Sequence, residues 1–117
     1  MRLLGIVMAL LLTGCGGIPA DKEVSVVEYG PYPDNYEEII KNFHLKVLKD
    51  PSSAQYQFFS PPTPYKFTNL RGSYAGYCVR VTYNAKNAFG AYTGFVTEGA
   101  IINYQAVVFY LAQLTCR

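Results

Sequence analysis

The sequence lacks what common catalytic and metal sites require. It has one histidine, His44, and three cysteines, none of them paired at the spacing of a zinc motif. A hydrolytic triad needs a base beside its nucleophile, common zinc sites need several cysteine or histidine ligands, and no glycine-rich phosphate-binding motif is present. Glu37 and Glu38 are adjacent rather than on one helix face. We therefore expect no enzyme, no metal site and no cofactor, and we expect His44 to be a partly exposed helix residue.

Charge is also sparse. The chain has ten Lys and Arg residues and eight Asp and Glu residues, and the basic ones are scattered along it. Nucleic-acid-binding surfaces carry a basic patch or stripe, and phosphate contacts supply much of their affinity. The eleven tyrosines are more simply interpreted as covering a small core while their hydroxyl groups stay in water. We expect no nucleic-acid partner.

No apolar run is long enough to span a bilayer, which takes about 20 residues. The longest tract, residues 3–12, follows the single charge of Arg2 and leads into Leu12-Thr13-Gly14-Cys15. A charged start, about 7–15 apolar residues and small residues at a cleavage site are typical of a secretory signal. The Leu-Thr-Gly-Cys segment resembles the lipobox of bacterial lipoproteins, which implies cleavage before Cys15 and lipidation of its thiol. An ordinary secreted protein with a chance cysteine is the alternative.

This interpretation predicts the organisation of the chain. Residues 1–14 form a signal peptide, residues 15–33 a lipidated cysteine and a Gly- and Pro-containing tether, and residues 34–117 one small domain. As an alternative to an irregular tether, residues 24–27 form a short strand that is added to the domain. The partner implied by Cys15 is a membrane. Gly16 follows it, and in the lipoprotein class an aspartate at that place retains the protein at the inner membrane, so we expect the periplasmic side of the outer membrane.

With Cys15 lipidated, two cysteines remain, Cys78 and Cys116. An oxidising compartment favours a disulfide between them, which would stabilise a domain with a thin core. Two separate thiols are the alternative.

The predicted fold class is α+β, with one N-terminal helix packed on an antiparallel sheet of about four strands. Residues 34–49 read as the helix, with Asp34 as its cap and Glu37 at the capping-box spacing. Its apolar stripe consists of Tyr36, Ile39, Ile40, Phe43 and Val47. Asp50-Pro51 ends the helix, because the residue before proline avoids helical angles.

Strands are predicted at residues 55–59, 65–68 and 74–83, and in the apolar stretch 101–114, as one long strand or two short ones. The best strand alternates with period two. Tyr77, Val79, Val81 and Tyr83 are expected to face the helix, and Cys78, Arg80 and Thr82 the opposite side.

The segment from residue 84 to 94 is rich in turn residues and predicts a long hairpin connection. It carries the candidate binding residues Lys86, Asn87, Phe89 and Tyr92, a combination of aromatic anchors and adaptable polar groups. The alternative is structural: the asparagines and glycines supply turn angles, and the aromatic rings cover the sheet edge.

Three segments resemble a set of small, uncharacterised bacterial and prophage lipoproteins. They are residues 48–56 (LKDPSSAQY), 76–79 (GYCV) and 84–94 (NAKNAFGAYTG). Those proteins join an LKDPxSAxY helix exit to an NAKNxxGxYTG loop. The resemblance covers about residues 29–94 and implies an envelope lipoprotein without an established reaction.

The functional hypothesis is a non-catalytic lipoprotein that binds a neighbouring envelope protein, without a small-molecule substrate. The resemblance to prophage proteins adds one variant, in which the protein masks an outer-membrane receptor. The alternative is a structural subunit of a secretion or envelope-spanning assembly, which an exposed strand edge within residues 101–114 would favour.

Overall fold

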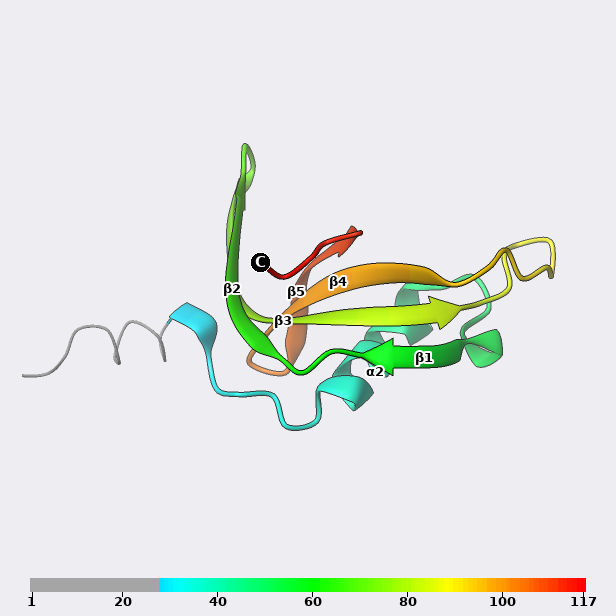
Figure 1. Cartoon of the computed structure of the whole chain (residues 1–117), viewed down its shortest axis with the longest axis horizontal. Helices are drawn as coiled ribbons and strands as arrows, with labels where there is room; N and C mark the ends of the chain where they lie inside the picture. Colours follow the sequence, from blue (N-terminus) through cyan, green and yellow to red (C-terminus); the bar gives the residue numbers. More distant parts are fainter. Residues whose placement is uncertain (1–27) are drawn as a thin grey trace, which may run out of the picture.

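The computed structural model describes residues 28–117. One helix, α2 (Tyr36–Val47), packs on an antiparallel sheet of five strands (Figure 1). The predicted α+β class is therefore confirmed, with five strands rather than about four. The predicted signal peptide, Cys15 and the tether up to residue 27 lie outside the described residues. No helix in the described part of the chain is long and apolar enough to cross a membrane.

The strands are β1 (Gln55–Phe59), β2 (Thr63–Asn69), β3 (Gly72–Asn84), β4 (Val96–Asn103) and β5 (Ala106–Ala112). Their order is β1-β3-β4-β5, and β2 also pairs with β3. Because β2 pairs with the first part of β3 and β1 with its last part, the two strands lie end to end along one edge of β3. Ser60 makes the corner between them: its amide donates to the Arg80 carbonyl, and its Oγ accepts from the Arg80 amide.

The fifth strand comes from the apolar stretch 101–114, which divides at a tight turn. Tyr104 and Gln105 form this turn with φ angles of 48° and 67°. Hairpin turns with two positive φ angles favour Asn and Gly, so this sequence carries no turn signal. The structure thus has two strands here, and the first of them already begins at Val96.

The helix begins one residue later than predicted. Asn35, not Asp34, precedes its first residue, and neither the predicted cap nor Asn35 caps the helix with a side chain. Asn35 Nδ2 instead donates to Gln105 Oε1 at 2.8 Å. The capping prediction is therefore wrong, and the side chain that sits at the cap position tethers the helix start to the β4–β5 turn.

The main core lies between α2 and the sheet. Its buried members are Ile39, Ile40, Val79, Val81, Tyr83, Ala100 and Ile102. The predicted alternation of β3 is confirmed for Val79, Val81 and Tyr83. Val47, predicted as part of the helix stripe, is 46% exposed, because the helix ends there and its last turn extends past the core.

A second core fills the opposite face of the sheet. Cys78, Ile101 and Leu114 are buried there, and a disulfide joins Cys78 to Cys116 across a Cα–Cα distance of 5.5 Å. The hairpin of β2 and β3 turns away from the rest of the sheet, and the C-terminal segment crosses beside it (Figure 1). Gly99 permits the close approach, since a Cβ at this position would lie 2.5 Å from the Leu114 Cβ.

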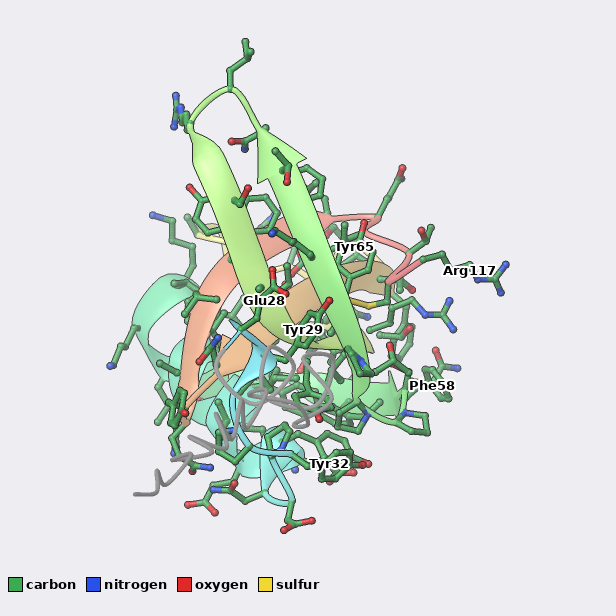
Figure 2. All side chains as sticks on the ribbon, turned by 90° about the vertical axis from the view of Figure 1, so that its left-hand side faces the viewer. Glu28, Tyr29, Tyr32, Phe58, Tyr65 and Arg117 are labelled. Atoms are coloured by element: carbon green, nitrogen blue, oxygen red, sulfur yellow. A yellow bond between two sulfur atoms is a disulfide. The ribbon has the colours of Figure 1, made fainter. Side chains whose placement is uncertain are left out.

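Residues 28–33, predicted as the end of the tether, contact the domain. The Glu28 carboxylate pairs with Lys66 at 2.6 Å, and Asn103 Nδ2 donates to the Glu28 carbonyl. The Tyr32 ring packs edge-on against Tyr77 at 5.3 Å. Figure 2 shows Glu28 and Tyr32 lying against the domain near the foot of the β2–β3 hairpin. Glu28 and Tyr29 have helical geometry, and the Gly- and Pro-containing residues that follow them run along the domain without continuing that helix.

Candidate functional site

The candidate binding loop, residues 85–95, connects β3 to β4. It projects from the end of the sheet opposite to the beginning of the described chain (Figure 1). A single antiparallel bridge between Lys86 and Tyr92 narrows it. The tip therefore consists of residues 87–91.

Asn87 organises this tip. Its Oδ1 accepts hydrogen bonds from the amides of Phe89 and Ala91, at 2.9 and 3.2 Å. Its backbone amide donates to the Ala91 carbonyl, and its carbonyl accepts from Gly90. An asparagine side chain that bonds to the backbone two residues on is a common turn device. The predicted binding role of Asn87 is thus accompanied by a structural one.

Ser53 attaches the loop to the rest of the domain. Its Oγ accepts from the Lys86 amide at 2.8 Å, and its carbonyl accepts from the Tyr92 hydroxyl at 2.8 Å. Ser53 Oγ also donates to the Asp50 carbonyl. The two longer segments that carry the resemblance, residues 48–56 and 84–94, are therefore one structural unit.

The side chains of Phe89 and Phe95 take no part in this network. Phe89 is 94% exposed at the tip, and Tyr92, Phe95 and Val96 are also exposed. Exposed large apolar side chains are thus concentrated in this segment of the chain. Lys86 Nζ lies 5.7 Å from the centre of the Tyr92 ring and forms no ion pair within residues 28–117.

The structure thus gathers all four predicted binding residues in one loop but separates their roles. Asn87 and the Tyr92 hydroxyl hold the loop, whereas the Phe89 ring is exposed and the partly exposed Lys86 forms no ion pair within residues 28–117. Phe95 and Val96 were not predicted. Their signal was weak, because an apolar pair after a turn reads equally well as the start of a buried strand.

His44 is the second place where chemistry could reside, and its predicted exposure is wrong. It is 1% exposed, because it lies one turn after Ile40 on the face that meets the sheet. Its Nδ1 lies 2.8 Å from the Tyr56 hydroxyl, and its ring centre lies 4.6 Å from that of Tyr83. Burial lowers the pKa of His44 to about 4, so the imidazole is neutral at pH 7.

A carboxyl group lies on the far side of Tyr83. The Tyr83 hydroxyl donates to Glu98 Oε1 at 3.0 Å and lies 3.2 Å from the Tyr110 hydroxyl. Burial raises the pKa of Glu98, and burial together with the Glu98 charge raises the pKa of Tyr83. His44 Nε2 and Glu98 Oε2 are buried without a hydrogen-bond partner among the described residues. Aromatic rings of the sheet enclose the imidazole, so the cluster holds α2 on the sheet.

Within residues 28–117, no three His, Cys, Asp or Glu side chains lie close enough together to hold a metal ion. Comparison of the chain with family models, with curated proteins and with solved structures finds no match.

Proposed function

We propose that this chain is a lipid-anchored envelope protein that binds a neighbouring envelope protein, without catalysis, through the loop of residues 85–95. One observation carries the proposal: Phe89 is almost fully exposed on a loop whose own hydrogen bonds fix its shape. Interface energy concentrates in a few anchors, often aromatic, that enter a pocket of the partner. A loop ordered before binding loses little conformational entropy on association, which favours affinity.

The direction of the loop supports the same function. The beginning of the described chain and the loop lie at opposite ends of the sheet (Figure 1). An anchor at Cys15 would therefore tend to hold the domain with Phe89 directed away from the bilayer. That orientation suits a partner whose binding surface lies in the periplasm or on the periplasmic side of a membrane protein.

The sequence supports the anchor and its place. Leu12-Thr13-Gly14-Cys15 indicates lipidation, and Gly16 indicates the outer membrane as the destination. Two or more acyl chains give stable anchoring, whereas one gives only marginal binding. The resemblance to prophage lipoproteins favours, within this function, the masking of an outer-membrane receptor.

A structural subunit of an envelope assembly is the second candidate function. The observation that favours it is the outer edge of β5, the last strand of the sheet, with which no strand of the described part of the chain pairs. An unpaired edge is a template for pairing with another chain. A repeating assembly would give oligomers of increasing size, whereas a binding module gives a complex of fixed composition.

Affinity capture after chemical crosslinking in intact envelopes tests the proposal. We expect the parent chain to recover a discrete partner and the Phe89→Ala variant to recover at least tenfold less. Leu70→Ala is the matched control, because Leu70 is a fully exposed apolar residue at the tip of the β2–β3 hairpin. Equal recovery by the parent and Phe89→Ala would refute the loop as the binding surface.

A further inference from the structure

The outer edge of β5 is apolar. The strand reads AVVFYLA, without a charge, proline or glycine, and no strand within residues 28–117 pairs with its outer side. Val108 and Leu111 are each 41% exposed. Natural proteins usually protect an edge with lysine, proline or a bulge. Here the register shift opposite Ile101 and Ile102 is the only such feature.

A polar stripe of α2 flanks the same edge. Glu38, Asn42 and Lys46 line a groove of about 330 Å³ together with Gln105 and the first two residues of β5. These three side chains are spaced four residues apart and share one face of the helix. The stripe therefore begins with the acidic Glu38, has the amide of Asn42 in the middle and ends with the basic Lys46.

The middle residue of the polar stripe of α2 and the middle residue of β5 lie at about the same height. Asn35 bonds to Gln105 at the start of β5, and the Phe43 ring packs on Tyr110 at 5.0 Å near its end. The helix and the strand therefore run in the same direction, and Asn42 lies about level with Phe109. Phe109 is the central residue of β5.

We propose that two copies of this chain associate through their β5 edges, about a two-fold axis that passes near Phe109 and Asn42. Antiparallel pairing of β5 with its symmetry mate brings the two α2 helices onto the same face of one continuous sheet. The axis then places Glu38 of each copy opposite Lys46 of the other copy, so that two equivalent ion pairs form. Because each edge is used once, the assembly closes at two copies.

This dimer leaves both loops of residues 85–95 free. The inference stands on a different surface from the binding loop, so it does not depend on the proposed partner. Confinement of lipidated chains to a membrane would raise their local concentration and favour the pairing.

A cysteine placed on the expected axis tests the dimer. The full chain in detergent carries Asn42→Cys and is treated with a short bis-maleimide, and the chain without the substitution gives the background. We expect a crosslinked dimer from Asn42→Cys. Glu37→Cys is the matched control, since Glu37 is exposed, lies about 140° from Asn42 around the same helix and should give only background. Equal yields from the two positions, or none from Asn42→Cys, would overturn the proposal.

Charge reversal tests the pairing of Glu38 with Lys46. In the Asn42→Cys background, Glu38→Lys or Lys46→Glu alone should lower the crosslinking yield several-fold, because each places like charges opposite one another. The double reversal restores opposite charges and should restore the yield. A double variant that crosslinks no better than the single ones would contradict the two-fold arrangement.

Discussion

Among single residues, His44 shows how burial determines the protonation state of a side chain. Its pKa of about 4 in the folded chain lies below the ordinary value of 6.5. Between these two pH values the unfolded chain binds a proton that the folded chain excludes. The free energy of unfolding therefore falls as the pH falls from 6.5 to 4, by about 3 kcal/mol over the whole interval.

Replacing His44 by Gln should remove this pH dependence. Urea unfolding of both proteins between pH 4 and pH 7 measures it. Glu98 acts in the opposite sense. Because folding raises the pKa of its carboxyl group, the free energy of unfolding falls as the pH rises above the ordinary pKa of a glutamate side chain. The difference between parent and His44→Gln isolates the histidine. The same pH dependence in both proteins would show that the imidazole is not held neutral by burial.

At the scale of elements, the loop and the core should respond differently to truncation. Phe89→Ala removes an exposed ring and should change the free energy of unfolding by no more than about 0.5 kcal/mol. Val79→Ala opens a cavity beneath α2, where Val79 is fully buried, and should cost a kcal/mol or more, about 1–3. Thermal unfolding compares the two. A Phe89→Ala variant as unstable as Val79→Ala would place Phe89 in the scaffold.

The Tyr92 hydroxyl should contribute to holding the loop. Tyr92→Phe removes the hydrogen bond to the Ser53 carbonyl and should cost about 1 kcal/mol while retaining the ring. Hydrogen exchange of the Lys86 and Ala91 amides reports on the loop directly and should become faster. Unchanged exchange would mean that the bond to Ser53 does not order the tip.

The sequence predicted the elements whose signals are local. The helix, the strand 55–59 and the inward side of β3 follow from periodicity within a dozen residues. The turn at Tyr104 and Gln105 was not predictable, because these residue types rarely adopt positive φ angles. The loop was predicted as a unit, but the partnership of Ser53 with Lys86 and Tyr92 joins residues 33 and 39 positions apart, which no local pattern reveals.

At the scale of the whole molecule, the disulfide ties the C-terminal segment to β3. It closes a loop of 38 residues, for which the loop-entropy model gives about 4 kcal/mol of stabilisation. The chain with both Cys78 and Cys116 replaced by Ala should lose about that much free energy of unfolding. Mass spectrometry after alkylation without reduction provides the chemical check, and two alkylated thiols in the native chain would refute the bridge.

The proposed anchor predicts where the chain is found. Cys15→Ser should yield an unprocessed or soluble form, since lipid chains contribute about 0.8 kcal/mol per buried methylene group. Membrane fractionation separates the outcomes, and the unaltered chain should accompany outer-membrane markers. A Cys15→Ser chain that is processed and stays in the membrane like the parent would exclude the lipoprotein interpretation.

Site-specific photocrosslinking at position 89 tests the central claim most directly. A photoreactive phenylalanine analogue replaces Phe89 in the full chain, and the same analogue at Leu70 serves as the control for an exposed apolar tip. Irradiation of intact cells should join residue 89 to one discrete envelope protein, and residue 70 should give no such product. No adduct at residue 89, or the same adducts from both positions, would contradict a binding function for this loop.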